Sequence, residues 1–529
     1  MPSQEDYCDV LVLGSGNAGF SAAVSAKQTT PSANVLLIDK CPEDWAGGNS
    51  YFTAGAFRTA HSGLEDLLPL VNNVSPDTAK IIDLPPYSPL DFEDDLKRVT
   101  NKLCDKELGR VLVEDSRETI GWLKDLGIRF QLSFNRQAYE VNGRWKFWGG
   151  LHLKTQDGGK GLIEDHLIAA EKHGIRISFS TAATRLITNV NGGVYGVEVV
   201  RGGKKMVVRC KAVVLAAGGF EANPRMRSQY LGPNWDLAHV RGTPYNTGDL
   251  LSIAIAPPIN AKQAGNWSGC HSVAWDADSP PNSGDRGVSN EFTKSGYPLG
   301  LMINVNGERF VDEGVDLRNY TYAKFGRAIL QQPDGIAYQI WDKKGSQMLR
   351  EEEYRPEVVK RIEASTIQEL GDQLGKEGLA RKERFVQTIE SYNQAVYAHR
   401  KEHANLTFDP SVKDRLSTQS SSLSLALPKS NWALPLDEPP FLAIKVTCGI
   451  TFTFGGLAVN PQTAALISQT TGKEIPGLFC VGEMMGGLFY GNYPGGSGLT
   501  SGAVFGRRAG RAAAELVRKA VGWDTRARL

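Results

Sequence analysis

The sequence predicts an α/β fold, in which a domain built on a parallel sheet is interrupted by an inserted α+β domain. Three observations lead to this prediction. The chain opens with an apolar strand, a glycine-rich turn and a helix, "YCDVLVLGSGNAGFSAAVSAKQ". Further glycine motifs stand near both ends, whereas the pattern changes after about residue 262. At 529 residues the chain is also too long for one simple core, so at least two domains are expected.

The opening turn has the spacing of a dinucleotide-binding loop. Gly14, Gly16 and Gly19 match G-x-G-x-x-G, in which glycine permits a tight turn and close approach of the backbone to a pyrophosphate. The N-terminus of the following helix supplies N–H groups and a positive dipole end to the phosphates. A second strand, "VLLIDK", ends with Asp39, which is placed to accept hydrogen bonds from an adenosine ribose.

Three more motifs indicate a cofactor longer than a single nucleotide unit would bind. They are "GGNSYFTAG" (47–55), "KAVVLAAGGFEANP" from Lys211 and "IPGLFCVGEMMGG" from Ile475. A simple NAD-binding unit would continue with regular strand–helix alternation. A site that wraps a longer cofactor instead draws residues from both ends of the chain, as these motifs do.

Together the four motifs resemble the FAD subunit family of fumarate reductases and succinate dehydrogenases. The resemblance implies a Rossmann-like FAD-binding domain with an inserted capping domain. It also implies that Asn49 and Ser50 lie by the pyrophosphate and flavin, and that Glu483 binds a ribityl hydroxyl. Membrane-bound members attach FAD through a histidine in the segment corresponding to 49–55, and because this chain has none there, non-covalent FAD is expected. The residues implied at the cofactor are Gly14, Gly16, Asn17, Ala18, Gly19, Asp39, Lys40, Gly48, Asn49, Ser50, Ala183, Ala217, Gly218, Thr247, Gly248, Asp249, Gly482, Glu483, Gly498 and Leu499.

The remaining elements are predicted from periodicity and turn signals. In chain order they are helices over 107–125 and 160–173, short strands within 183–216, a hairpin over 299–313 that turns at Asn306-Gly307, a long amphipathic helix over 376–402, an irregular Ser- and Pro-rich return over 417–440, and a helix from about Thr500. The expected FAD-binding domain comprises residues 1–262 and 446–529, and the capping domain comprises residues 263–445.

The candidate catalytic residues rest on a closer resemblance that spans nearly the whole chain. The stretches "GNWSGCH" (265–271), "RNYTYAK", "PKSNWA" (428–433), "CGITFTFGGL" (448–457) and "NYPGGSGLT" are similar to those of tricarballylate dehydrogenases, which oxidise a C–C bond of a tricarboxylate to an alkene and give hydride to FAD. By resemblance to the wider family, Arg318, which follows "ERFVDE", would transfer the proton. His271 matches a family histidine that binds a substrate carboxylate.

Two positions depart from the soluble fumarate reductases. Where those enzymes hold substrate carboxylates with a histidine and an arginine, this chain has Phe452 and Tyr493. Because a dianion in a low-dielectric pocket needs its charges paired, fumarate and succinate are not the expected substrates. The loop around Tyr493 is also similar to that of 3-ketosteroid dehydrogenases, where a tyrosine donates to a carbonyl oxygen. Tyr320 and Tyr322 are alternative bases to Arg318, since a tyrosine has a pKa near 10 and arginine stays protonated.

The resulting hypothesis is an FAD-dependent oxidoreductase acting on a CH–CH bond of a polycarboxylate such as tricarballylate, or of a related carboxylic acid. Arg318, His271, Tyr493 and Tyr320 are its candidate catalytic residues. The alternative is a ketone α,β-dehydrogenase or ene-reductase, and a flavin-binding redox protein without turnover is a third hypothesis. The sequence has no haem or cluster motif and no convincing second nucleotide motif, so electrons are expected to pass through a separate protein, a quinone or dioxygen.

Composition disfavours several other classes. The 59 basic and 58 acidic residues balance, which gives no reason to expect a nucleic-acid surface. The seven cysteines are scattered without a C-x-x-C motif, which argues against a bound metal and fits a reducing compartment. No apolar run is long enough to span a bilayer and no signal peptide is evident, so a cytoplasmic location is expected. The terminal Ala-Arg-Leu is similar to a peroxisomal address and would carry meaning only in a eukaryote.

Overall fold

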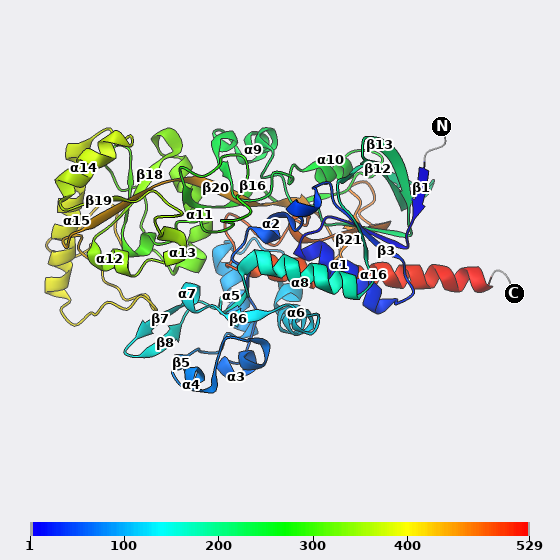
Figure 1. Cartoon of the computed structure of the whole chain (residues 1–529), viewed down its shortest axis with the longest axis horizontal. Coiled ribbons are helices and arrows are strands. Elements are labelled where there is room, and N and C mark those ends of the chain that lie inside the picture. The colour runs from blue at the N-terminus through cyan, green and yellow to red at the C-terminus, as the bar shows by residue number, and fades with distance from the viewer. Residues whose placement is uncertain (1–3, 527–529) are drawn as a thin grey trace.

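A six-stranded sheet forms the centre of the larger domain in the computed structural model, which describes residues 4–526 (Figure 1). Its neighbouring strands pair in parallel except at one edge, where β21 is antiparallel to β22. In spatial order the strands are β10 (Arg176–Ser178), β3 (Val35–Ile38), β2 (Val10–Leu13), β14 (Ala212–Leu215), β22 (Glu474–Cys480) and β21 (Ala465–Ile467). Strands β2, β3 and β14 are continuous apolar runs buried at every residue, as expected for a parallel sheet covered on both faces. The predicted α/β fold with a parallel sheet is confirmed.

Two helices from opposite ends of the chain pack together beside this sheet. They are α1 (Asn17–Thr29) and α16 (Ser497–Arg526), which Figure 1 shows side by side. A Cβ atom at Gly506 or Gly510 would come within 2.6 or 2.2 Å of a carbonyl oxygen of α1, so glycine allows the close contact. The helix that the sequence predicts from about Thr500 is α16, which begins three residues earlier, at Ser497.

The short strands predicted within 183–216 are present. The strands β11 (Thr181–Thr188), β12 (Val194–Arg201) and β13 (Lys204–Arg209) form an outer sheet with β1 (Gln4–Tyr7), and β14 enters the central sheet. The predicted helices over 107–125 and 160–173 are α6 (Lys106–Asp125) and α8 (Gly158–Lys172).

Residues between β3 and β10 also build a lobe below the central sheet in Figure 1. Its elements are β4 (Ala56–Phe57), α3 (Leu64–Leu67), α4 (Pro76–Ala79), β5 (Ile82–Asp83), α5 (Pro89–Val99), β6 (Phe130–Leu132), α7 (Phe134–Gln137), β7 (Ala138–Val141), β8 (Arg144–Phe147) and β9 (Leu153–Thr155). The short helix α2 (Gly48–Tyr51) instead packs against α8. The helix α5 begins with a reciprocal capping box between Ser88 and Asp91, which satisfies two N–H groups at its start.

The capping domain contains a second mixed sheet with helices around it. The sheet comprises β15 (His239–Val240), β16 (Gln263–Asp276), β17 (Leu301–Asn304), β18 (Ala337–Trp341), β19 (Ile362–Ala364) and β20 (Phe441–Leu457), and the helices around it are α11 (Tyr322–Leu330), α12 (Lys343–Gln347), α13 (Glu351–Tyr354), α14 (Ile367–Lys376) and α15 (Lys382–Glu402). The helices α9 (Pro224–Leu231) and α10 (Asp249–Ile255) precede the cap in the chain, and their buried Leu231 and Leu251 belong to the same hydrophobic cluster as β2 and β14. The long strand β20 pairs with β16 along most of its length and runs toward the central sheet (Figure 1). The predicted boundary at 445/446 falls inside this strand, so the domain limits stay a prediction.

Two predicted elements differ from the structure. The helix predicted over 376–402 is interrupted before Lys382, because Gly378 has a positive φ of 108° and separates α14 from α15. The chain does turn at Gly307, but the return arm of the predicted hairpin makes only one bridge, between Ile303 and Arg309, and β17 pairs with β18 instead. Residues 417–440 contain no helix or strand of their own, as predicted.

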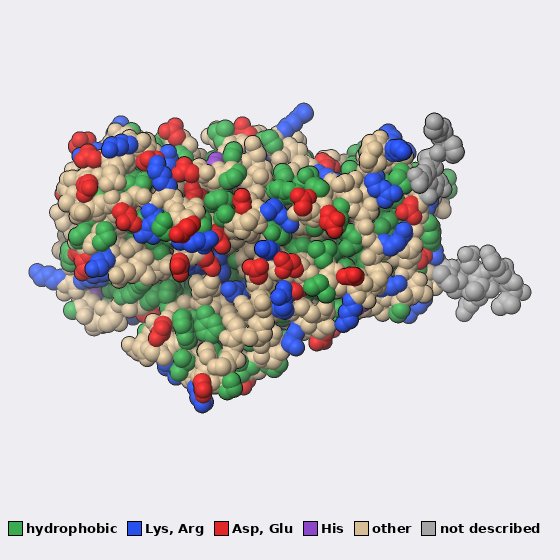
Figure 2. Space-filling view, in the orientation of Figure 1, with side chains coloured by type: hydrophobic (Ala, Val, Ile, Leu, Met, Phe, Trp, Pro, Cys, Tyr) green, Lys and Arg blue, Asp and Glu red, His purple; other side chains and the backbone are tan. Residues whose placement is uncertain are grey.

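Basic and acidic side chains are interspersed on the face that Figure 2 shows, in keeping with the balanced charge. None of the helices within 4–526 is both long and apolar enough to cross a bilayer. In the same range, no three His, Cys, Asp or Glu side chains are grouped so that they could hold a metal ion. The terminal Ala-Arg-Leu lies outside the described residues.

Candidate active site

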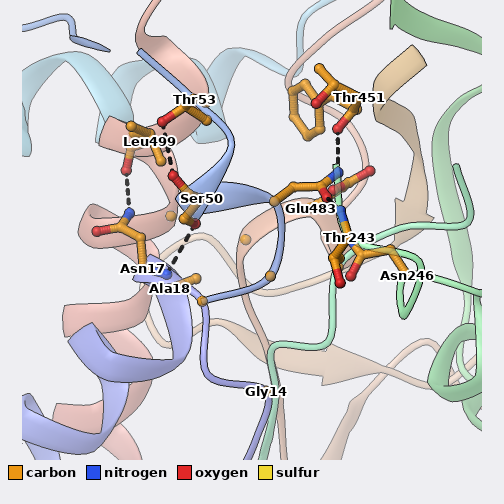
Figure 3. Close-up of a pocket in the computed structure, with 18 of the residues that line it drawn as sticks. Gly14, Asn17, Ala18, Ser50, Thr53, Thr243, Asn246, Thr451, Glu483 and Leu499 are labelled. Carbon is orange, nitrogen blue, oxygen red and sulfur yellow. Dashed lines mark hydrogen bonds between the residues drawn. The ribbon is translucent and has the colours of Figure 1, made fainter. Parts of the chain in front are cut away.

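A cavity lies where the central sheet meets the sheet of the cap. Its wall at one end is formed by the turn after β2, the end of β3 and the start of α2. At the other end the wall is formed by His271 on β16, Tyr322 at the start of α11, and Tyr493. Figure 3 shows that the segments carrying Gly14 and Glu483, which are distant in sequence, face the same space.

The residues that are predicted from the sequence to bind FAD lie around this cavity. All of them except Gly19 line it. A Cβ atom at Gly19 would lie 1.9 Å from the carbonyl oxygen of Gly14, so Gly19 allows α1 to pack against the turn rather than facing the cavity. Gly14 itself has a φ of 121°, and a Cβ there would meet the carbonyl oxygen of Ala216 at 2.3 Å.

A carboxylate stands at the expected nucleotide end. Asp39, at the end of β3, accepts hydrogen bonds through Oδ2 from Ser15 N and Ser15 Oγ, at 2.8 and 2.7 Å. Cys41 N donates to its other oxygen at 3.0 Å. These bonds fix the carboxylate beside the glycine turn, where the N-terminus of α1 faces the cavity without a side-chain cap from Gly16.

Asn17 ties together three segments that surround the cofactor end of the cavity. Its main-chain N–H donates to Ser50 Oγ at 3.1 Å, and its side-chain amide donates to the carbonyl oxygen of Leu499 at 2.8 Å (Figure 3). Asn17 therefore connects three segments, which are the first helix, the "GGNS" segment and the start of the last helix. This contact explains why motifs from both ends of the chain are needed to form the site.

Two buried carboxyl groups lie close together in the same region. Glu483 lines the cavity and accepts hydrogen bonds from Thr453 N and Oγ1, at 2.6 and 2.9 Å. Glu221 is fully buried and accepts from the side-chain amide of Asn246 at 2.5 Å. Burial raises the pKa of Glu483 to about 7, and burial together with the Glu483 charge raises that of Glu221 well above its usual value. The Oε2 atom of Glu221 has no hydrogen-bond partner among the described residues.

These residues fit an FAD molecule. Asp39 would supply the acceptor for a ribose, the glycine turn and the N-terminus of α1 would supply the phosphate site, and Glu483 would supply an acceptor for a hydroxyl group. Among the described residues, the one histidine that lines the cavity is His271, which belongs to the cap end. Non-covalent attachment stays a prediction.

Three side chains form a hydrogen-bonded chain at the cap end of the cavity. The Tyr493 hydroxyl lies 3.0 Å from the Tyr322 hydroxyl and 3.2 Å from His271 Nδ1. Burial raises the pKa of Tyr493 well above 10, and burial with the nearby Arg241 charge lowers that of His271 well below 6.5. Both groups are therefore neutral near pH 7. Phe452 packs edge-on against Tyr493, with ring centroids 5.6 Å apart.

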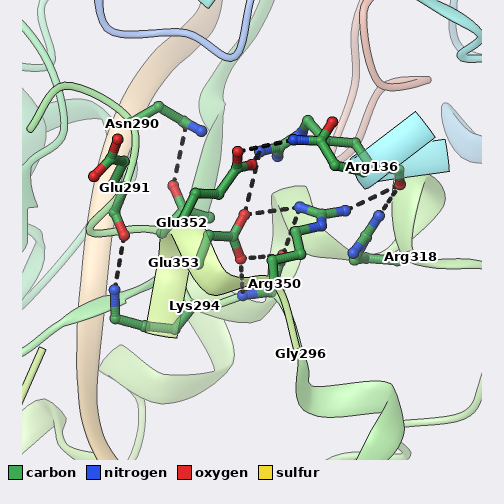
Figure 4. Close-up of polar contacts among 12 residues, drawn as sticks. Arg136, Asn290, Glu291, Lys294, Gly296, Arg318, Arg350, Glu352 and Glu353 are labelled. Atoms are coloured by element: carbon green, nitrogen blue, oxygen red, sulfur yellow. Dashed lines mark hydrogen bonds and ion pairs between the residues drawn. The ribbon is translucent and has the colours of Figure 1, made fainter. Parts of the chain in front are cut away.

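Arg318 lines the cavity and forms no ion pair within the described part of the chain. Its guanidinium donates to the main-chain carbonyl of Arg136 and lies 5.4 Å from the ring centroid of Trp148. Arg350 donates to the same carbonyl at 3.0 Å (Figure 4). Asp312 accepts a hydrogen bond from Ser430 and Asp316 pairs with Arg98, so neither aspartate pairs with Arg318 and its guanidinium remains available to a ligand.

A buried carboxylate holds this arginine cluster in place. Glu353 accepts hydrogen bonds from Arg350 at 2.7 Å, Arg136 at 3.2 Å and Ser295 Oγ at 2.5 Å (Figure 4). Because Arg136 supplies the carbonyl to which Arg318 donates, Glu353 fixes the position of Arg318 indirectly.

The structure does not bring Tyr320 to the cavity. Its hydroxyl donates to Asp95 at 2.5 Å and lies 2.9 Å from the carbonyl oxygen of Gly149. Burial raises the pKa of Tyr320 to about 12. Tyr322, two residues further on, begins α11 and faces the cavity instead. His271, Arg318 and Tyr493 do line the cavity, and their catalytic roles stay a prediction.

Sequence reasoning missed several residues of the site. Arg241, Arg136 and Gln137 line the cavity, and Glu221 pairs with Glu483. Glu221 could have been found, because it follows the "AAGGF" motif directly. Arg241 carries no motif signal, since its place beside Thr451 depends on pairing between β15 and β20, which are far apart in sequence.

Comparison with known proteins places these features in context. A family model described as an FAD binding domain matches residues 9–499. The chain is 28% identical to the probable fumarate reductase Ifc3 of Shewanella frigidimarina (strain NCIMB 400), over 96% of this chain and 74% of that protein. It is 26% identical to 4-oxocyclohex-2-ene-1-carboxylate 5-dehydrogenase of Sinomonas cyclohexanicum, over 96% and 94%. The open conformation of a flavocytochrome c3 fumarate reductase superposes with a TM-score of 0.71 at 25% identity, over 97% of this chain and 79% of that chain.

Proposed function

The chain belongs to the FAD binding domain family, as an FAD-dependent oxidoreductase related to the fumarate reductases, and on this premise we propose that it removes or adds a pair of hydrogens across a CH–CH bond of a carboxylic acid of the tricarballylate type. The single observation that carries the proposal is the guanidinium of Arg318. It lines the same cavity as the neutral donors of Tyr493 and His271 and has no ion pair in the described chain. A half-buried cation without an anionic partner is stabilised when an anion joins it, which a substrate carboxylate would do.

The chain's own residues would handle the proton and the orientation of the substrate. Bound FAD supplies the hydride chemistry, taking a hydride from one carbon or giving it back. In the oxidative direction the adjacent carbon loses a proton, and Tyr322 is the candidate base. In the reductive direction that carbon gains a proton, and Arg318 is the candidate donor because it stays protonated. Tyr493, kept neutral by burial, would donate its one hydroxyl proton to His271 Nδ1 and so orient the His271 ring toward the substrate.

A second candidate is the oxidation or reduction of a ketone next to its carbonyl. The contact between the hydroxyls of Tyr322 and Tyr493 favours it, because one tyrosine can donate to a carbonyl oxygen while the other takes the proton of the neighbouring carbon. The relative from Sinomonas cyclohexanicum is named for a substrate that carries both a ketone and a carboxylate. The two candidates therefore differ in what accepts the Tyr493 hydroxyl proton, which is His271 Nδ1 in the first and a substrate carbonyl oxygen in the second.

The reductive half-reaction tests the proposal. Holoenzyme reduced with dithionite under anaerobic conditions is mixed separately with an unsaturated tricarboxylate, an unsaturated monocarboxylate and an uncharged cyclic enone. The proposal expects the acids to restore the absorption of oxidised flavin faster than the enone does. Reoxidation by the enone alone would favour the ketone reaction instead.

The electron partner of the flavin is a further proposal. A separate protein, a quinone or dioxygen would exchange electrons with the flavin. Because no second nucleotide motif accompanies the first, the reduced flavin is expected to be insensitive to NAD⁺. Mixing the reduced holoenzyme with each acceptor in turn would identify the partner.

A further inference from the structure

Arg241 is a buried arginine with unused donors. It lies at the end of β15, lines the cavity and is 5% exposed. Within the described chain its guanidinium makes one hydrogen bond, to the side-chain oxygen of Asn290, and no ion pair. Its Nε is buried without any partner. Burial lowers the pKa of Arg241, as expected for a cation that no carboxylate compensates.

A second buried arginine shows what a purely structural role looks like in this fold. Arg227 is 3% exposed and also lacks a carboxylate partner. Its guanidinium nitrogens nevertheless donate to main-chain carbonyl oxygens, among them Trp235 at 2.8 Å and Asp236 at 2.8 Å. Because carbonyl oxygens satisfy Arg227 and do not satisfy Arg241, the two arginines differ in what they still require.

His271 supplies a second unused donor in the same cavity. It is 3% exposed, and its Nε2 has no hydrogen-bond partner among the described residues. When Tyr493 donates its hydroxyl proton to Nδ1, the neutral ring carries its hydrogen on Nε2. Arg241 and His271 both adjoin the same part of β20, since Thr451 Oγ1 donates to the main-chain oxygen of Arg241 and His271 pairs with Phe452, and both side chains line the cavity.

We propose that Arg241 and His271 together bind a carboxylate group of the substrate, through the guanidinium of Arg241 and the Nε2–H of His271. This inference rests on the proposed function and names the group that orients the substrate. A carboxylate can accept hydrogen bonds from both donors, which have no acceptor among the described residues, and its negative charge compensates the buried charge of Arg241. The substrate class is therefore an acid with a carboxylate fixed at this point, whether or not it also carries a ketone. Phe452 and Tyr493, with ring centroids 5.6 Å apart, line the cavity with aromatic surface against which an apolar carbon skeleton can pack.

Ligand-dependent thermal unfolding of the holoenzyme tests the proposal without requiring turnover. The probes are two matched pairs: tricarballylate with its uncharged triamide, and 4-oxocyclohexanecarboxylate with its uncharged carboxamide. A ligand that binds the folded state raises the unfolding temperature according to its affinity. We expect the wild type to bind at least one carboxylate more tightly than its amide. In Arg241→Gln the affinity for that carboxylate should fall about 30-fold or more, since truncating one partner of a buried charge pair typically has at least that effect.

The amide and the unliganded proteins provide the controls. Affinity for the amide should change by less than about threefold in Arg241→Gln, because the amide carries no charge to pair. Without ligand, Arg241→Gln should unfold at the wild-type temperature or above it, since the substitution removes an uncompensated buried cation. Arg241→Lys keeps the charge but loses the planar donor pair, and should give an intermediate affinity. If Arg241→Gln fails to retain FAD, the comparison between wild type and Arg241→Lys decides.

The outcomes separate this proposal from the proposed function. Equal carboxylate affinity in wild type and Arg241→Gln would overturn the assignment of Arg241 and leave the reaction type standing. A wild type stabilised equally by acid and amide, or by neither acid, would overturn the carboxylate site itself. Tight carboxylate binding that depends on Arg241, with no change in flavin absorption, would support the site and contradict the proposed oxidation of that acid.

Discussion

Replacing the hydroxyl of Tyr493 tests the hydrogen-bonded chain at the cap end of the cavity. Tyr493→Phe removes contacts of 3.0 Å to Tyr322 and 3.2 Å to His271 and leaves the ring in place. Two neutral hydrogen bonds contribute about 1 kcal/mol each to stability, so unfolding should become easier by about 2 kcal/mol. If the hydroxyl also acts on the reacting substrate, the rate should fall by about 10²- to 10⁴-fold, which corresponds to about 3–5 kcal/mol of transition-state stabilisation.

The assay is stopped-flow measurement of flavin reduction at saturating substrate, with FAD content checked by absorbance. Tyr297→Phe is the matched control, because Tyr297 is 1% exposed, lies outside the cavity and bonds through its hydroxyl to Thr321 at 2.7 Å. The control loses one hydrogen bond, so it should lose about 1 kcal/mol of stability and keep its rate. A Tyr493→Phe protein that reduces its flavin at the wild-type rate would refute the catalytic role and leave Tyr493 as a packing residue.

Three further predictions concern Arg318 and the buried carboxyl groups. Arg318→Ala should retain FAD, and its turnover rate should be at least about 10²-fold lower than that of the wild type, because the proton donor is lost. A turnover rate equal to that of the wild type would show that Arg318 does not transfer the proton. Glu353→Gln should cost about 3–5 kcal/mol of stability in chemical denaturation, because it leaves Arg136 and Arg350, whose side chains are 13% and 8% exposed, without their shared carboxylate. Glu352→Gln, the control, changes a side chain that is 35% exposed and should cost less than about 1 kcal/mol. Burial raises the pKa of Glu483 from 4.5 to about 7, so the folded apoprotein binds more protons than the unfolded chain in that window, and its stability should fall as pH rises from 4.5 to about 7. The denaturation midpoint of Glu483→Gln should show a smaller fall, because burial still raises the pKa of Glu221 in that variant.

The cofactor end of the site could be predicted because its signals are local. The conformations of Gly14 and its neighbours are set by a turn of a few residues, and Asp39 follows a strand whose apolar run is visible in the sequence. The contact between Asn17 and Leu499 brings the other motifs to the same place, and the family resemblance anticipated this meeting.

The cap end could be predicted only in part, because its geometry depends on helix phase and long-range pairing. Tyr320 and Tyr322 are two residues apart, and the start of α11 decides which of them faces the cavity. Arg241 reaches the site through pairing of β15 with β20, which joins residues about 210 positions apart, a contact that no local pattern reports. Phe452 and Tyr493, in place of the histidine and arginine of the soluble fumarate reductases, indicated a different substrate site. They did not indicate which other residue could supply a positive charge to it.

Anaerobic mixing of the oxidised holoenzyme with tricarballylate tests the central claim most directly. The visible absorption of the flavin is followed, and the experiment is repeated with other saturated carboxylic acids and with uncharged ketones. We expect a carboxylic acid to reduce the flavin, with loss of its visible absorption, and we expect the corresponding unsaturated acid to be formed as product. Bleaching by uncharged ketones alone, with every acid inert, would contradict the claim that this oxidoreductase acts on the CH–CH bond of a carboxylic acid.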